Sequence, residues 1–170
     1  MLYSIIIPVY NRANEVKELL ESLCAQTVKP FELLIIEDGS NERCDYLLDH
    51  YRSFFPIHYY YKPNSGRSDT RNYGLERAGG DYMLFFDSDV ILPPQYFEKL
   101  EAAMQQEYTD CFGGPDAADA SFSDIQKAVN HSMTGFWTTG GIRGGKVVTE
   151  KFCPRTFNMG LSKKVYETVG

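Results

Sequence analysis

Short apolar runs alternate with helix-like segments along the first ninety residues of this 170-residue chain. The runs are rich in β-branched and aromatic side chains and predict strands at residues 2–9, 31–37, 57–61 and 81–86. Between them, apolar residues recur at the spacing of amphipathic helices. Strands that alternate with helices at short intervals are typical of βαβ units. We therefore predict an α/β fold, with an open, mostly parallel sheet and helices on both faces.

Each helical segment is expected to bury one apolar stripe. The first helix should end near Gln26, the third should span residues 68–78, and the fourth should open at Pro93 and Pro94. The stripes predicted for the four helices are, in chain order, Val16, Leu19, Leu20 and Leu23; Tyr46, Leu47, His50 and Tyr51; Leu75 and Ala78; and Phe97, Leu100, Ala103 and Met104.

Beyond the fourth helix the regular alternation ends. Residues 111–114 predict a short fifth strand, and residues 117–131 favour a helix. The glycine-rich run at 138–146 predicts a surface loop that orders on ligand binding. Residues 155–162 predict a return to the sheet, and residues 163–169 a helix. We expect the whole chain, residues 1–170, to form a single domain.

Charge and cysteine usage limit the class of protein. The net charge is −6, with 23 acidic against 17 basic residues, which argues against a nucleic-acid partner. No apolar run approaches transmembrane length, and residues 2–9 lack the basic leader of a signal peptide. Since the cysteines do not have zinc or redox spacing, we expect them to be reduced and mostly buried in a cytoplasmic protein. They are Cys24, Cys44, Cys111 and Cys153.

The loops that follow the predicted strands carry most of the polar residues outside the helices. These loops are residues 8–12, 37–40, 62–67 and 87–91. Right-handed crossovers place the carboxyl ends of parallel strands at one edge of the sheet. Ligands of open α/β sheets bind at that edge. We therefore expect the four loops to form one binding site.

Two carboxylates, Asp87 and Asp89, follow the fourth predicted strand. Carboxylates this close repel each other and lose hydration when partly buried. Mg²⁺ or Mn²⁺ relieves both effects and typically takes one or two carboxylates together with substrate phosphates. The pattern predicts a metal-diphosphate site. The alternative is an acidic turn, in which one Asp caps the next element and the other is solvated.

Four short motifs stand in order along the chain and together resemble the family 2 glycosyltransferases, which have the GT-A fold. The motifs are Pro8-Val9-Tyr10-Asn11-Arg12, Glu37-Asp38-Gly39-Ser40, Asn64-Ser65-Gly66 with Thr70-Arg71-Asn72-Tyr73-Gly74, and Asp87-Ser88-Asp89. The resemblance covers residues 3–90, with a weaker similarity at 157–170. It implies a Rossmann-like core that binds nucleotide sugar and metal at residues 1–115, and part of an acceptor-side region at 116–170.

The resemblance also implies which residues bind the nucleotide of the donor. They are Pro8, Val9, Tyr10, Asn11, Arg12, Asp38, Arg71, Asp87 and Ser88. The ring of Tyr10 would pack on the base, or alternatively in the core. Asp38 would accept a hydrogen bond from the base, from N3–H of uracil, or would cap the segment after Gly39. Arg12 would reach the nucleotide, or would be a solvated charge.

The remaining implied roles concern the diphosphate and the metal. Arg71 would contact the diphosphate or the base, or would instead pair with Asp69 or Glu76. Asp87 would hold the ribose hydroxyls or a metal-bound water. Asp89, with Asp87 as the second candidate ligand, would bind Mn²⁺ or Mg²⁺ between the two phosphates.

The activity implied by the resemblance is an inverting transfer of a sugar from a nucleoside-diphosphate sugar, UDP-linked, to a hydroxyl group. A carbohydrate or glycolipid acceptor would place the reaction in surface polysaccharide or glycolipid synthesis, near the inner face of the cytoplasmic membrane. The family's general base comes from a later segment and is expected beyond Gly170, so the chain resembles a truncated enzyme. The alternatives are a nucleotide-sugar-binding fragment without catalysis and a nucleotidyltransferase. Asn72 and Gly74 are expected to serve close helix packing.

Overall fold

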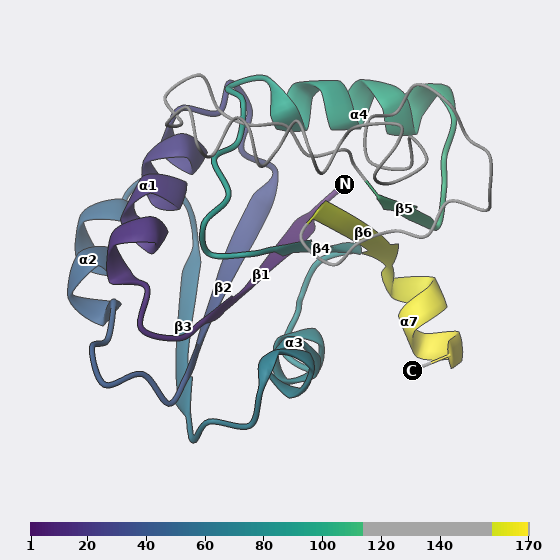
Figure 1. Ribbon diagram of the computed structural model, residues 1–170. Coiled ribbons are helices and arrows are strands. Elements are labelled where there is room, and N and C mark those ends of the chain that lie inside the picture. The colour runs from purple at the N-terminus through teal and green to yellow at the C-terminus, as the bar shows by residue number, and fades with distance from the viewer. Residues whose placement is uncertain (114–157, 170) are drawn as a thin grey trace, which may run out of the picture.

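The computed structural model describes residues 1–113 and 158–169, which form one six-stranded sheet covered by helices (Figure 1). The strand order is β3-β2-β1-β4-β6-β5. The first four strands in the chain pair in parallel, whereas β6 pairs antiparallel with β4 and β5. The strands are β1 (Tyr3–Val9), β2 (Phe31–Asp38), β3 (Ile57–Lys62), β4 (Tyr82–Phe86), β5 (Cys111–Gly113) and β6 (Asn158–Ser162). The predicted mostly parallel α/β sheet is confirmed.

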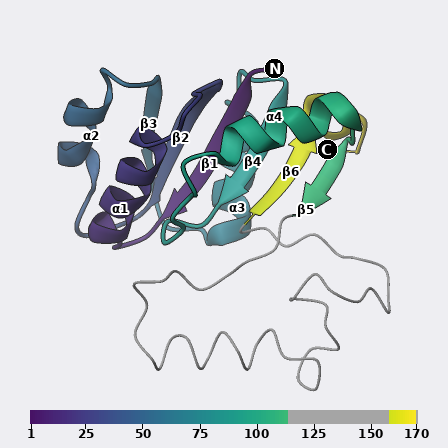
Figure 2. The ribbon, with the colours of Figure 1, turned by 90° about the horizontal axis from the view of Figure 1, so that it is seen from above.

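Helices cover both faces of the sheet, as predicted (Figure 2). The helices are α1 (Ala13–Cys24), α2 (Asp45–Tyr51), α3 (Arg67–Leu75), α4 (Tyr96–Gln106) and α7 (Lys163–Val169). Successive side chains of a strand point to opposite faces. Ile5 and Ile7 of β1 accordingly pack with α1, α2 and α4, whereas Ile6 packs on the face of α3 and α7. The central strands β1, β2 and β4 are therefore apolar on both faces.

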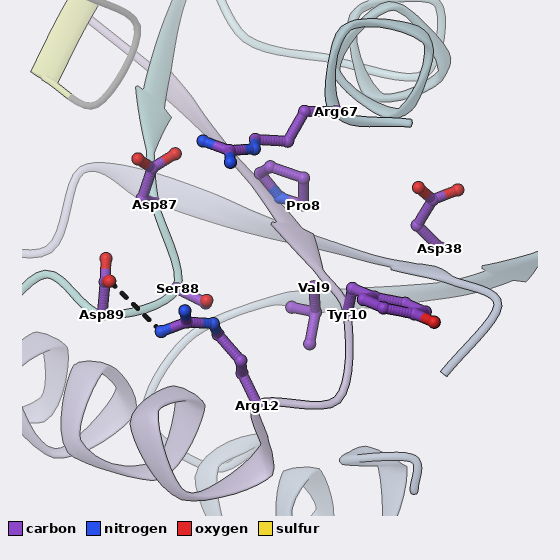
Figure 3. A pocket seen from close by; sticks show the side chains of 9 residues that line it. All are labelled: Pro8, Val9, Tyr10, Arg12, Asp38, Arg67, Asp87, Ser88 and Asp89. Atoms are coloured by element: carbon purple, nitrogen blue, oxygen red, sulfur yellow. Dashed lines mark hydrogen bonds and ion pairs between the residues drawn. The ribbon is translucent and has the colours of Figure 1, made fainter. Parts of the chain in front are cut away.

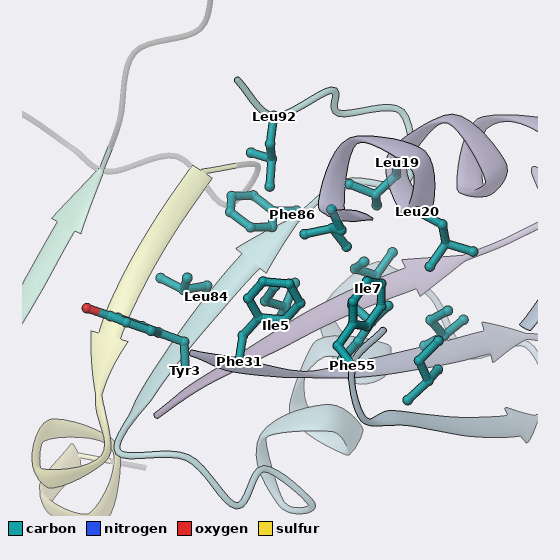
Figure 4. Close-up of a cluster of buried hydrophobic side chains, with 14 of the residues drawn as sticks. Tyr3, Ile5, Ile7, Leu19, Leu20, Phe31, Phe55, Leu84, Phe86 and Leu92 are labelled. Atoms are coloured by element: carbon teal, nitrogen blue, oxygen red, sulfur yellow. The ribbon is translucent and has the colours of Figure 1, made fainter. Parts of the chain in front are cut away.

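Aromatic rings form the centre of the larger core cluster, on the α1, α2 and α4 face (Figure 4). Phe31 of β2 lies 4.6 Å from Phe97 of α4 and 5.2 Å from Phe55, measured between ring centroids. Tyr3 of β1 lies 5.8 Å from Phe97. Packed aromatic pairs stabilise beyond their buried area. These contacts fix α4 over the amino-terminal half of the sheet and leave the carboxyl edge open for the site.

Several predicted helix faces and boundaries differ from those observed. In α2 the buried residues are Leu48 and Tyr51, whereas Tyr46 is 69% exposed and His50 is also exposed. A seven-residue helix has two turns, and the pair three residues apart that meets the sheet decides which side is buried. In α4, which begins two residues after Pro94, Phe97 and Met104 are buried as predicted. The other two predicted positions are less buried, because Leu100 is half-buried and Ala103 is exposed.

The remaining structural predictions have mixed outcomes. The return to the sheet before residue 162 and the helix after it are confirmed by β6 and α7. The predicted helix at 117–131 and the glycine-rich loop at 138–146 lie outside the described residues. Cys24, Cys44 and Cys111 are free thiols, as predicted, but only Cys44 is buried. None of the helices within the described ranges has the length and apolarity needed to cross a bilayer.

Close packing of α3 on the sheet depends on Gly74. A Cβ atom there would lie 2.5 Å from Cγ2 of Ile6 and 3.0 Å from Cδ1 of Ile36. Real Cβ atoms do not approach other atoms this closely, so any side chain at residue 74 would push α3 away from the sheet. The expectation for Gly74 is confirmed, whereas Asn72 is exposed.

We expect Gly74→Ala to lower the free energy of unfolding by about 1–3 kcal/mol, because overpacking outweighs the better helix propensity of alanine. Urea unfolding followed by circular dichroism measures this change. Asn72→Ala, on the exposed side of the same helix, is the matched control and should stay within about 0.5 kcal/mol of the original chain. Equal stability of the two variants would contradict the close-packing role of Gly74.

Candidate functional site

A pocket opens at the carboxyl edge of the sheet, where β1, β2 and β4 end and α3 begins (Figure 3). It confirms the predicted convergence of the strand-end loops. All nine lining residues belong to the four predicted strand-end loops, and Arg67, the last residue of the predicted loop at 62–67, is the first residue of α3. The lining residues are Pro8, Val9, Tyr10, Arg12, Asp38, Arg67, Asp87, Ser88 and Asp89.

The carboxylate of Asp38 is held firmly at one wall of the pocket. It accepts hydrogen bonds from Nζ of Lys62 at 2.5 Å and from the backbone N–H groups of Ser65 and Gly66, both at 2.9 Å. Burial opposes ionisation of Asp38, but these donors outweigh it and lower the pKa of the carboxyl group. Asp38 is therefore an ionised acceptor. It organises the loop before α3, so the alternative that it caps the segment after Gly39 is wrong.

Lys62 is a part of this wall to which the sequence analysis gave no role. It is the last residue of β3 and is only 8% exposed. Besides Asp38, its ammonium group contacts the hydroxyl of Ser65 and lies 3.4 Å from the carboxylate of Asp69. The sequence feature that could have predicted this contact is a lysine at the end of the third strand, because parallel pairing places Lys62 opposite Asp38.

Asn11 joins two of the loops that form the pocket instead of lining it. Its backbone N–H donates to the hydroxyl of Ser40 at 2.9 Å, and its side-chain oxygen accepts from the N–H of Asn41 at 2.8 Å. Asn11 has a φ of +52°, in the left-handed region that asparagine tolerates better than most residues. The contacts hold the β1 loop against the β2 loop.

Tyr10, next to Asn11, lies on the open side of the pocket. Its side chain is 52% exposed, so the alternative that it packs in the core is wrong. It lies across the pocket from the carboxylates of Asp87 and Asp89, whereas Pro8 and Val9, which also line the pocket, are buried (Figure 3). An exposed ring beside a polar wall is suited to stacking on a planar ligand.

Asp87 and Asp89 each pair with an arginine. Oδ1 of Asp87 lies 2.6 Å from Nη2 of Arg71, and Oδ2 of Asp89 lies 3.3 Å from Nη1 of Arg12. The Arg71 pair is mostly buried, whereas Arg12 and Asp89 are about half exposed and pair weakly. The predicted alternatives for Arg71, pairs with Asp69 or Glu76, are wrong. Arg71 lies beneath the pocket and orients Asp87, and it is not one of the lining residues.

The two carboxylates have the chemistry to bind a divalent cation whose remaining coordination positions are filled by a substrate. Within residues 1–113 and 158–169, Oδ2 of Asp87 and Oδ1 of Asp89 accept no hydrogen bond from the protein. The same residues contain no group of three or more histidine, cysteine, aspartate or glutamate side chains that could hold a metal alone. Mg²⁺ is commonly bound by one or two carboxylates with substrate phosphates. The donor set therefore matches a metal shared between Asp87, Asp89 and a phosphorylated ligand.

The family model of glycosyl transferase family 2 matches residues 4–170. The chain belongs to glycosyl transferase family 2. Among curated members, an uncharacterized glycosyltransferase of Rickettsia felis is 41% identical over 102 residues, and one of Haemophilus influenzae is 38% identical over 105 residues. These alignments cover 60% and 62% of this chain, but only 16% and 35% of the respective relatives.

Solved structures confirm the GT-A fold of this family 2 domain. S. aureus TarS 1-349 in complex with UDP is 26% identical, with a TM-score of 0.66 over 72% of this chain and 38% of that one. The mannosyltransferase PcManGT from Pyrobaculum calidifontis, in complex with GDP-Man and Mn²⁺, matches 99% of this chain and 46% of its own with a TM-score of 0.72. It is 14% identical and shows the shared fold alone.

Proposed function

We propose that this domain binds a UDP-linked sugar in the carboxyl-edge pocket and belongs to an enzyme that transfers the sugar, with inversion, to a hydroxyl group. The observation that carries the proposal is the placement of an ionised, buried Asp38 and of two adjacent carboxylates, Asp87 and Asp89, in one pocket. Binding of UDP by TarS, a relative of the same fold, supports the choice of nucleotide. Family membership favours sugar transfer over nucleotidyl transfer.

The base would occupy the end of the pocket formed by Tyr10 and Asp38. Tyr10 supplies an exposed aromatic face on which a pyrimidine can stack. Asp38, ionised and only 5% exposed, accepts a hydrogen bond from an N–H of the base, such as N3–H of uracil. A base without an N–H at this position would lose this charge-assisted hydrogen bond and would bind more weakly.

The ribose and diphosphate would extend from the base toward Asp87 and Asp89. Asp87, oriented by Arg71, accepts from a ribose hydroxyl or a metal-bound water, while Asp89 provides a metal-binding carboxylate. Arg12 can leave Asp89 at little cost because their pair is exposed, and its guanidinium then turns to the phosphates. A Mn²⁺ or Mg²⁺ ion bound here would neutralise the charge on the departing diphosphate.

The acceptor side of the reaction is proposed from the family alone. A carbohydrate or glycolipid hydroxyl would attack the anomeric carbon from the face opposite the diphosphate, with its proton taken by a general base. Such acceptors favour a role in polysaccharide or glycolipid synthesis at the inner face of the cytoplasmic membrane. The alternative is that these residues bind nucleotide sugar without transferring it. In that case the donor would bind, but no sugar would be transferred.

Calorimetric titration of UDP and GDP, with Mn²⁺ and then with EDTA, tests the donor site. We expect UDP to bind in Mn²⁺ and to lose at least about 100-fold in affinity in EDTA, because metal neutralisation of a diphosphate is worth several kcal/mol. Preference for GDP would show that the base is guanine instead of uracil, and it would leave the proposed diphosphate site unchanged. Equal affinities with and without metal would refute the metal site, and no binding of either nucleotide would refute the donor pocket.

A further inference from the structure

Each carboxylate that lines the pocket contacts a cation, whereas Arg67, which also lines the pocket, contacts no carboxylate of the described residues. Three carboxylates line the pocket, and each contacts its own cation: Asp38 contacts Lys62 at 2.5 Å, and Asp87 and Asp89 contact Arg71 and Arg12 at 2.6 and 3.3 Å. Arg67 also lines the pocket, but no ion pair or hydrogen bond of its side chain occurs within the described ranges. Arg67 is therefore a pocket-lining cation that no carboxylate of the described residues neutralises.

The position of Arg67 indicates which part of a ligand this cation would meet. Arg67 is the first residue of α3, and its side chain extends across Pro8 toward Asp87 (Figure 3). The same view places Asp38 and Tyr10 at the other end of the pocket. A guanidinium that points away from the base-binding end and toward the pair Asp87 and Asp89 lies beside the space where phosphates and metal would meet.

We propose that Arg67 is a binding residue for the diphosphate of the donor, and that it makes the pocket discriminate a nucleoside diphosphate from a monophosphate. This inference rests on the proposed donor site. A guanidinium offers a planar fork of N–H donors that matches two phosphate oxygens. Because Arg67 has no ion pair to break among residues 1–113 and 158–169, its charge is available to the ligand.

The assignment also separates the roles of two arginines that the sequence places close together. Arg71, the residue expected to contact the diphosphate, is 9% exposed and bonded to Asp87, so its charge is already matched. Arg67 is one helical turn earlier, exposed, and directed into the pocket. Arg71 is thus a positioning residue for Asp87, whereas Arg67 contacts the ligand.

The test compares the affinities of UDP, UMP, uridine and inorganic pyrophosphate, in Mn²⁺, for the original chain, Arg67→Gln and Arg67→Lys. We expect Arg67→Gln to weaken UDP by about 10- to 100-fold, the usual effect of losing a charge-assisted hydrogen bond, and to leave uridine unchanged. Arg67→Lys keeps the charge but not the fork and should fall between the two. Arg43→Gln is the matched control, because Arg43 is exposed and stacks on Tyr61 at 3.9 Å outside the pocket lining.

Two results would overturn the assignment. If Arg67→Gln binds UDP with the original affinity, Arg67 does not contact the diphosphate. If Arg67→Gln and Arg43→Gln weaken UDP equally, the effect is one of overall charge. If the original chain binds pyrophosphate through Arg67 but no nucleotide, the nucleotide proposal fails while the anion role of Arg67 is retained. Unchanged melting temperatures of all variants establish that they are folded.

Discussion

Asp89→Asn is expected to reduce the affinity for UDP in Mn²⁺ by about 100-fold or more, because a metal-binding carboxylate is lost and several kcal/mol of phosphate neutralisation goes with it. In EDTA the same substitution should have little effect. The two conditions, measured by calorimetry on the same preparation, separate a lost metal ligand from a damaged pocket. Binding in Mn²⁺ that is unaltered by the substitution would contradict the metal role and restore the acidic-turn interpretation of Asp87 and Asp89.

The fold should tolerate this substitution. Asp89 is half exposed, and its pair with Arg12 at 3.3 Å belongs to a class that contributes at most about 1 kcal/mol to stability. Arg12 has a second acidic neighbour, Glu15, at 3.5 Å. Glu15→Gln therefore serves as the matched control, since it removes a carboxylate from Arg12 without touching the metal ligands. Glu15→Gln should bind UDP in Mn²⁺ with nearly the original affinity.

Asp38→Ala is expected to lower the free energy of unfolding by about 3–5 kcal/mol and to abolish recognition of the base, because it leaves the buried charge of Lys62 with only the exposed carboxylate of Asp69 as a partner. The backbone N–H groups of Ser65 and Gly66 would lose their acceptor at the same time. Urea unfolding measures the first effect, and comparison of UDP with pyrophosphate measures the second. Pyrophosphate binding should survive, since Asp38 lies at the opposite end of the pocket from Asp87 (Figure 3).

A double variant makes this prediction specific to the pair. Adding Lys62→Met to Asp38→Ala removes the stranded charge, so part of the lost stability should return while base recognition stays absent. If the double variant is no more stable than Asp38→Ala, the instability comes from the loop after β3 and not from the buried ammonium group. If Asp38→Ala alone keeps the original stability, Lys62 does not depend on Asp38 for its charge partner.

The sequence by itself determined the architecture and the position of the site at the carboxyl edge of the sheet. The β-branched and aromatic runs at 2–9, 31–37 and 81–86 are apolar on both faces, and only central strands of a covered parallel sheet bury such runs fully. The right-handed crossover rule then brings their polar ends to one edge. For this reason the sequence alone predicts that Asp38, Asp87 and Asp89 lie in one site, and all three line the pocket.

Only the tertiary structure decided which charges meet there. Arg71 has acidic residues close by in the sequence, at 69 and 76, yet it pairs with Asp87, 16 positions away. Arg67 is a ligand-facing cation only because folding brings Lys62, Arg71 and Arg12 to the carboxylates that line the pocket. The periodicity of apolar residues is a local property that can be read from the sequence. Pairing among several cations and carboxylates is a competition decided by distances across loops, and those distances exist only in the folded chain.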